Sequence, residues 1–169
     1  MNASLLPLGP FKCQITLTVV RPAIQQRHEE GGVTFLLASD YELAYSTVLQ
    51  FSDGRELPIA AKLFAVMNKQ LVLRNAEGQP ARVVGYAQGR SEIWGTNGDL
   101  LFEGHYYDTR LSWDLTGDET FTPAAVRSAN HWENSFGSGD YAGHAFSLGV
   151  HFTKTATTPM GGEATGRIE

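Results

Sequence analysis

The sequence contains very little cysteine, since Cys13 is the only one among 169 residues. A single cysteine excludes an intrachain disulfide and a cysteine-rich zinc site. Cys13 lies inside an apolar, β-branched run, whereas a nucleophilic thiol needs an electropositive setting. We therefore interpret Cys13 as a small buried hydrophobic side chain.

Positive charge is also scarce. Lysine and arginine together number 13 against 18 aspartate and glutamate residues, which gives a formal net charge of −5. A chain without a basic patch cannot neutralise a phosphate backbone, so we expect no nucleic-acid partner.

Long apolar runs are missing as well. No run approaches the roughly 20 residues that a membrane-spanning helix needs. The short apolar patch near the N-terminus has no basic residue ahead of it and is interrupted by Pro7 and Pro10, which argues against a signal peptide. We expect a cytoplasmic protein with no membrane partner, and the sequence leaves open whether it forms a homodimer.

The familiar catalytic motifs are absent from the sequence: it has no nucleophile elbow, no His-Glu-x-x-His helix, no P-loop and no dinucleotide-binding fingerprint. The glycine-rich segment 137–143 precedes a predicted strand instead of a helix and holds no lysine, so it does not resemble a phosphate-binding loop. The five histidines, at positions 28, 105, 131, 144 and 151, show no metal-ligand spacing. We predict neither a metal nor a cofactor.

What the sequence does contain is the alternation of apolar and polar residues that is typical of half-buried antiparallel strands. It is clearest in residues 11–20, 41–51 and 145–152. Asp53-Gly54 and Asn97-Gly98 are strong hairpin-turn signals. Six or more short strands joined by such turns predict a mainly β fold, a small antiparallel β-barrel with one or two short helices.

The predicted organisation is an N-terminal arm at 1–10, a barrel domain at 11–153 and a flexible C-terminal tail at 154–169. Thr122 and Pro123 resemble a helix start, so we predict a helix from there to Asn134. Residues 57–68 fit helical spacing in part and are ambiguous. Residues 21–32 are polar and predict a loop.

The segment 82–94 is predicted as one long strand with unequal faces. One face carries large residues, and the other carries the mostly small set Val83, Gly85, Ala87, Gly89, Ser91 and Ile93. Glycines in a strand mark bulges, corners or the close approach of a ligand or of other backbone. If the small face points inward, we expect a cavity, with Gly85, Ala87 and Gly89 as substrate-binding candidates; if the large face does, we expect a filled barrel.

The densest group of polar and aromatic residues is the segment 103–108. Alternation places Glu103, His105 and Tyr107 on one face, and Phe102 and Tyr106 on the other. If the first face points inward, the three side chains could perform general acid–base catalysis and are our catalytic candidates. If it points outward, they are ordinary exposed residues and the two aromatics belong to the core.

Other candidates for substrate contact are aromatic. Trp132, at the end of the predicted helix, is either docked on the barrel or part of a lid over its mouth. Tyr41 and Tyr45 share a face that is core or pocket, and tyrosine favours sites where its hydroxyl finds a partner. Tyr141, in the glycine-rich turn, and Phe146, on the apolar face of the last strand, complete the substrate-binding set.

The turn 137–143 and the strand that follows resemble the closing strand of barrels in the allene oxide cyclase-like superfamily, and the segment 98–104 resembles a hairpin of that group. The resemblance implies an allene oxide cyclase-like fold, with a calycin-like barrel as the alternative, around a mostly apolar cavity. Relatives of this kind include plant allene oxide cyclases, dirigent proteins and bacterial polyketide cyclases, some of which promote [4+2] cycloadditions without a cofactor.

Two functions therefore stay open. The first is a cofactor-independent cyclase or isomerase that holds a hydrophobic, polyketide-like intermediate in one reactive conformation, which needs shape more than a signature motif. The second is a barrel that binds a small lipophilic ligand without chemistry. A filled barrel that acts only through interactions is a weaker third.

Overall fold

The computed structural model describes residues 6–66, 68–116 and 123–169. Within them the chain forms one thirteen-stranded sheet and one short 3-10 turn, η1 (Gly139–Tyr141). The strands are β1 (Gly9–Thr16), β2 (Thr18–Arg21), β3 (Ile24–Glu30), β4 (Val33–Ser39), β5 (Glu42–Phe51), β6 (Glu56–Ala65), β7 (Asn68–Arg74), β8 (Pro80–Gly85), β9 (Gln88–Gly95), β10 (Leu100–Leu115), β11 (Pro123–Gly137), β12 (Phe146–Lys154) and β13 (Gly161–Ile168).

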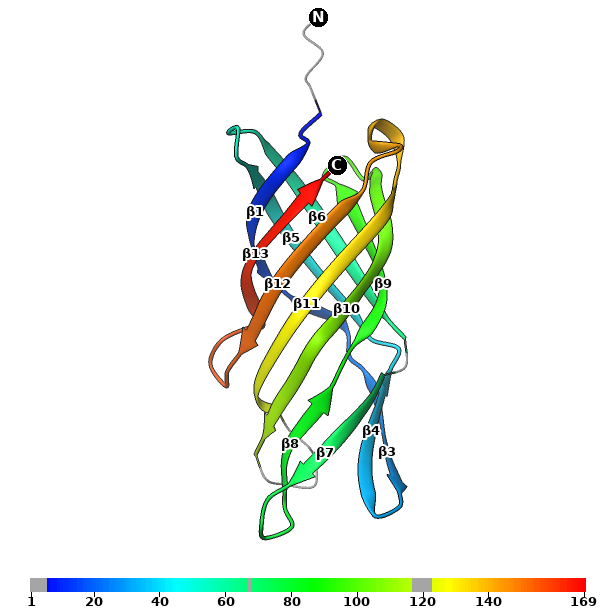
Figure 1. Cartoon of the computed structure of the whole chain (residues 1–169), viewed down its shortest axis with the longest axis vertical. Coiled ribbons are helices and arrows are strands. Elements are labelled where there is room, and N and C mark those ends of the chain that lie inside the picture. Colours follow the sequence, from blue (N-terminus) through cyan, green and yellow to red (C-terminus); the bar gives the residue numbers. More distant parts are fainter. Residues whose placement is uncertain (1–5, 67, 117–122) are drawn as a thin grey trace, which may run out of the picture.

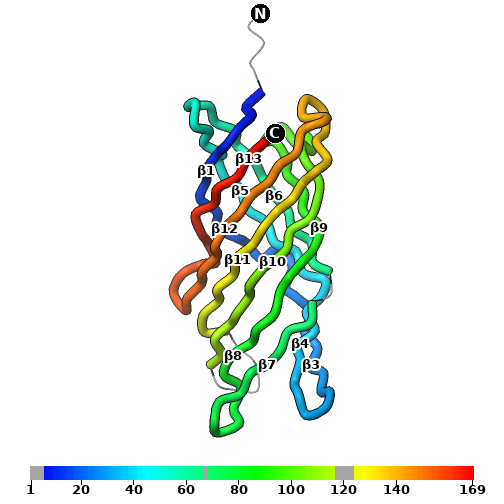
Figure 2. Tube along the Cα trace, viewed as in Figure 1, coloured from blue at the N-terminus to red at the C-terminus, as the bar shows by residue number. Residues whose placement is uncertain are grey.

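Eight of the strands close into a barrel, which confirms the predicted fold class (Figure 1). Their order around the wall is β1-β5-β6-β9-β10-β11-β12-β13, and every neighbouring pair is antiparallel. The ring closes where β13 pairs with all of β1, from Gly9↔Ile168 to Thr16↔Gly161. Figure 2 shows these two strands, from opposite ends of the chain, running side by side.

The strands β3, β4, β7 and β8 extend one end of the barrel, and we call them the annex (Figure 1). The long strand β10 joins the two parts, because its first half pairs with β9 and its second half pairs with β8. The annex has a small core of its own, in which Leu36, Val72 and Val83 pack with Trp113 and Leu115.

The opposite end of the barrel is closed by aromatic side chains, which we call the aromatic plug. Its ring centroids lie 4.9–5.7 Å apart, a separation typical of favourable aromatic pairs. The members are Phe11, Phe51, Phe102, Tyr141 and Phe146. This end of the interior is therefore filled.

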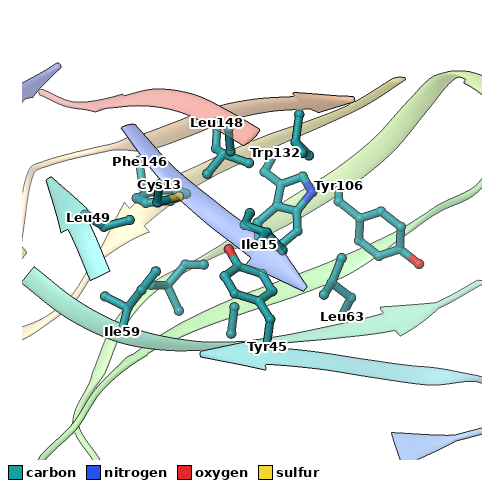
Figure 3. Packing of buried hydrophobic residues seen from close by; sticks show 14 of the residues in the cluster. Cys13, Ile15, Tyr45, Leu49, Ile59, Leu63, Tyr106, Trp132, Phe146 and Leu148 are labelled. Carbon is teal, nitrogen blue, oxygen red and sulfur yellow. The ribbon is translucent and has the colours of Figure 1, made fainter. Parts of the chain in front are cut away.

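Below the plug the interior is packed by aliphatic residues and one aromatic pair. The rings of Tyr45 and Trp132 lie 5.1 Å apart, and Figure 3 shows them among Ile15, Leu49 and Leu148. All five are buried. Cys13 lies in the same cluster, as predicted, and burial raises the pKa of its thiol to about 11.

Several local predictions are confirmed. The alternation in 145–152 places Phe146, Leu148, Val150 and Phe152 inside the barrel. Gly54 and Gly98 have φ of 86° and 87° in the β5–β6 and β9–β10 hairpins, a conformation that glycine adopts without steric cost.

The predicted helix at 123–134 is wrong, since these residues belong to β11; its start at Thr122 lies outside the described residues. The inward residues of this strand include Ser128, Asn130 and Asn134, which are polar and buried. Because polar residues lie on the inner face, the sequence of β11 lacks the alternation of apolar and polar residues that indicates a strand. Its apolar residues match a helical spacing only by coincidence.

The expectation of a flexible tail at 154–169 is also corrected, because residues 161–168 form β13. Its inner face offers little apolar surface, and its glycines lie where neighbouring strands approach closely.

The predicted loop at 21–32 contains β3, which is exposed on both faces and so shows no alternation. The ambiguous segment 57–68 is mostly β6, and the predicted single strand 82–94 is divided between β8 and β9. Of the arm at 1–10, the last two residues belong to β1, and residues 1–5 lie outside the described residues.

The packing of β13 predicts a contrast between two glycines of the β12–β13 pair. A Cβ on Gly166 would overlap the backbone oxygen of Ser147 and the ring of Phe11, whereas a Cβ on Gly149 would have its nearest neighbour at 3.6 Å. We expect Gly166→Ala to lower the free energy of unfolding by about 1–3 kcal/mol, and Gly149→Ala to leave it nearly unchanged. Urea denaturation measures both. Equal stability of the two variants would contradict the closure of the barrel by β13.

Candidate functional site

The half of the barrel next to the annex is not filled by side chains. Beyond Trp132 and Tyr45 lies a cavity of about 570 Å³, a volume typical of small-molecule sites. Its wall is mainly apolar and comes from β5, β6, β10, β11 and β12, with Leu43, Leu63, Leu111, Val126 and Phe152. Exposed Arg21, Gln25 and Lys154 stand at its rim, so the cavity opens to solvent at the annex end.

The small face of segment 82–94 points inward, as the cavity hypothesis expects. Ala87 lines the cavity. The glycines do not leave open space, however. A Cβ on Gly89 would overlap the backbone oxygen of Phe64 and lie 2.7 Å from the ring of Tyr106, and a Cβ on Gly85 would lie 3.1 Å from Gln70. The glycines therefore mark the close approach of neighbouring backbone and side chains, and Gly85 and Gly89 shape the site without lining it.

One group of polar side chains on the cavity wall is centred on Asp108. This carboxylate is only 8% exposed and accepts hydrogen bonds from the Ser128 hydroxyl and from the Asn130 amide, the latter at 2.8 Å. Asn130 in turn accepts a hydrogen bond from the Trp132 indole. A β-bulge after Asp108 lets both Asp108 and Leu111 face inward although they are three residues apart.

The environment of Asp108 favours its protonated form. Burial raises its pKa above the usual 3.8, and the hydrogen bonds from Ser128 and Asn130 offset this only in part. A buried carboxyl with a raised pKa, in a cavity, is a candidate general acid or base.

Two tyrosines form the other polar group. The Tyr106 hydroxyl donates to the Tyr41 hydroxyl at 3.2 Å, and the Asn68 amide donates to the same Tyr41 oxygen at 3.3 Å. Because Tyr41 accepts both bonds, its own proton is available to a bound molecule. Burial raises the pKa of both tyrosines, and the charge of nearby Asp108 raises it further, so both remain hydrogen-bond donors at neutral pH. Figure 3 shows the Tyr106 hydroxyl pointing away from the packed cluster.

The structure does not bring the three catalytic candidates into this cavity. His105 and Tyr107 are exposed, and Glu103 is half-buried on the same outer face. Tyr107 donates a hydrogen bond to Glu133 at 3.1 Å and stacks on His131. These three residues lie on the outer face because Phe102 and Tyr106 offer more apolar surface, so the face of β10 that carries the two aromatics is the one that is buried.

Only some of the predicted substrate-binding residues line the cavity. Tyr41 and Ala87 line the cavity. Trp132 is 1% exposed and packs on Tyr45 in the core of the barrel, so it is not a lid, and neither side chain lines the cavity. Tyr141 and Phe146 belong to the aromatic plug at the other end and do not line the cavity.

Sequence reasoning missed Asp108, Ser128, Asn130 and Gln70. A signal for Asp108 was present, since it continues the alternation of Phe102 and Tyr106 along the same strand. Ser128 and Asn130 had no such signal, because their segment matched a helix pattern. Gln70 lies on the annex and reaches the cavity only through the tertiary structure.

Comparison of the chain with protein-family models, with curated proteins and with solved structures finds no match. Among the described residues, no helix is long and apolar enough to cross a membrane. The same residues contain no cluster of three or more side chains suited to hold a metal ion. The cavity and its polar groups are therefore the features of the chain that point to a function.

The raised pKa of Asp108 predicts a specific pH dependence of stability. Below pH 3.8 the carboxyl is protonated in the folded and unfolded states alike. As pH rises above this value the unfolded state loses its proton first, so the folded state loses stability relative to it until the folded pKa is passed. The variant Asp108→Asn has no titrating proton at this position and keeps an acceptor oxygen for Ser128 and Asn130.

We therefore expect Asp108→Asn to gain stability relative to the wild type as pH increases from 3.8, by at most about 1.4 kcal/mol per pH unit. Urea unfolding at intervals from about pH 3 to about pH 8 measures this difference. Asp140→Asn, at an exposed site in η1, is the matched control for the substitution itself. Parallel pH profiles of wild type and Asp108→Asn would show that Asp108 titrates normally.

Proposed function

We propose that the chain is a cofactor-independent cyclase or isomerase acting on an apolar, polyketide-like intermediate that carries a carbonyl group. The observation that carries this proposal is the buried carboxyl of Asp108, held near two tyrosine hydroxyls in an otherwise apolar cavity. A few convergent polar groups in an apolar pocket are typical of ligand sites, and a perturbed carboxyl among them favours chemistry over simple binding.

In the proposed reaction the substrate carbonyl accepts a hydrogen bond from Tyr41. Ionised Asp108 removes a proton from the carbon next to that carbonyl, and the negative charge develops on the carbonyl oxygen, where the Tyr41 hydroxyl stabilises it. The carbon then attacks an electrophilic enone carbon of the same molecule and closes a ring, and Asp108 returns its proton to the new enolate. Substrate and product are isomers, so no co-reactant is consumed.

The apolar walls contribute by holding the flexible substrate in the conformation that cyclises, which lowers the entropic part of the barrier. A [4+2] cycloaddition in the same cavity would use this confinement and the Tyr41 hydrogen bond without any proton transfer. The resemblance of segments 98–104 and 137–152 to allene oxide cyclase-like barrels supports either reaction.

The apolar wall favours a second candidate function, a barrel that binds a small lipophilic ligand without turnover. Ligand binding alone requires the cavity but gives no role to the proton of Asp108. The two candidates are therefore separated by turnover and by its dependence on Asp108.

Turnover is measured with linear polyketide analogues that carry a β-dicarbonyl and a conjugated enone, followed by chromatography and mass spectrometry for a product of unchanged mass. We expect Asp108→Asn to slow ring closure by roughly 10²–10⁴-fold and Tyr41→Phe by roughly 10²–10³-fold. Tyr107→Phe, which removes a hydroxyl from the outer face, is the matched control and should retain wild-type rates.

If ring closure slows in Tyr41→Phe but not in Asp108→Asn, the cycloaddition is favoured, since that reaction needs no base. Wild-type rates in both inner variants would remove the two residues from the mechanism. Binding of the analogues without any isomeric product would favour the second candidate function.

Access to the cavity is tested independently with the fluorescent lipophile Nile red. Ala87 is buried on the cavity wall, so the side chain of Ala87→Phe would enter the open space. We expect this variant to keep its fold, by circular dichroism, and to bind the dye at least about tenfold more weakly. Ala142→Phe, on the exposed turn before β12, is the control. Unchanged affinity in Ala87→Phe would place the dye outside the cavity.

A further inference from the structure

Gln70 is a buried polar residue whose hydrogen bonding is incomplete. It lies on β7 of the annex, is 2% exposed and lines the cavity. Its side-chain oxygen has no hydrogen-bond partner among the described residues. Buried polar groups in proteins are nearly always paired, so an unpaired acceptor at a cavity wall requires an explanation.

The neighbouring residue on the same face of β7 provides a contrast. The Asn68 side chain is paired inside the protein at both ends, because it donates to the Tyr41 hydroxyl at 3.3 Å and accepts from the Gln88 backbone at 3.1 Å. The only other unpaired buried side-chain atom in the described chain is the Tyr45 hydroxyl, which belongs to the packed core and does not line the cavity. Within the same described ranges, Gln70 alone combines an unpaired buried atom with access to the cavity.

The position of Gln70 is also constrained by its surroundings. Its Cγ and Cα lie 3.1 and 3.2 Å from where a Cβ of Gly85 would be, so this close packing depends on a glycine in β8. The side chain is thus held against the wall by the annex itself. A side chain held in place with an unpaired acceptor is pre-organised to bind a ligand donor.

We infer that Gln70 is a specificity-determining residue that accepts a hydrogen bond from a hydroxyl or enol of the bound molecule. The inference rests on the proposed function and deepens it by naming the substrate class. Residues 68 and 70 are about 6.8 Å apart along the strand, so the group bound at Gln70 is near the carbonyl bound at Tyr41. The substrate is therefore an apolar molecule with a carbonyl and a hydroxyl or enol a few bonds away.

The test compares two probes of nearly equal shape, 2-naphthol, which donates a hydrogen bond, and 2-methoxynaphthalene, which does not. Isothermal titration calorimetry gives the affinity of each. We expect the wild type to prefer 2-naphthol by roughly tenfold, because the donor satisfies the buried oxygen. Gln70→Leu, with a side chain of similar size, should bind the two probes equally.

Gln26→Leu is the matched control, since Gln26 is an exposed glutamine on β3 that does not line the cavity. It should keep the wild-type preference. Gln70→Met serves the same purpose as Gln70→Leu if that variant fails to fold, as judged by circular dichroism.

The outcomes separate this inference from the proposed function. If the wild type binds both probes with equal affinity, or if the Gln70 variants retain the preference for 2-naphthol, the role of Gln70 is overturned while the cavity remains a binding site. If the wild type binds neither probe, the cavity is not a site for apolar ligands, and the proposed function fails together with the inference.

Discussion

Closure of the sheet by β13 is the constraint on which the rest of the structure depends. β13 is hydrogen-bonded to β1 on one side and to β12 on the other, so it joins the two ends of the chain and leaves neither strand as an open edge. Only a closed wall creates an interior that water does not reach freely. The raised pKa of Asp108 and the packing of Trp132 both follow from that enclosure.

The interior that closure creates is filled unequally. The aromatic plug and the Tyr45–Trp132 pair occupy one half, and the annex extends the wall around the other half, where the cavity lies. The closely packed core and the open cavity thus lie at different ends of one barrel. This separation allows a cavity in a small domain, because the packed half provides apolar burial that the open half lacks.

The polar groups of the cavity come from segments far apart in the sequence. Tyr41 precedes β5, Asn68 and Gln70 lie on β7, and Asp108 lies on β10. Tyr41, Gln70 and Asp108 line the cavity, and Asn68 is hydrogen-bonded to Tyr41, whereas the rest of the cavity wall is mainly apolar. Their convergence is a property of the barrel and its annex together, since neither part alone contains all of them.

The sequence by itself determined the strands with strong alternation, such as residues 145–152, and the turns at Asp53-Gly54 and Asn97-Gly98, because these depend on local burial and local backbone geometry. From them the barrel class followed. It did not determine β11 or β13, because several of their inward residues are polar or very small and their strand conformation depends on distant partners.

For the site, the sequence indicated Tyr41 and Ala87 but left open which face of segment 103–108 points inward, and the catalytic candidates lie on the outer face of β10. Which face of a strand points inward is decided by the total apolar surface that the whole barrel can bury, and Phe102 and Tyr106 decide it here. The pairing of Asp108 with Ser128 and Asn130, and the position of Gln70 at the cavity, are likewise set by strand register and by the annex. Only the tertiary structure decided them, because hydrogen bonds across strands join residues whose separation along the chain carries no local signal.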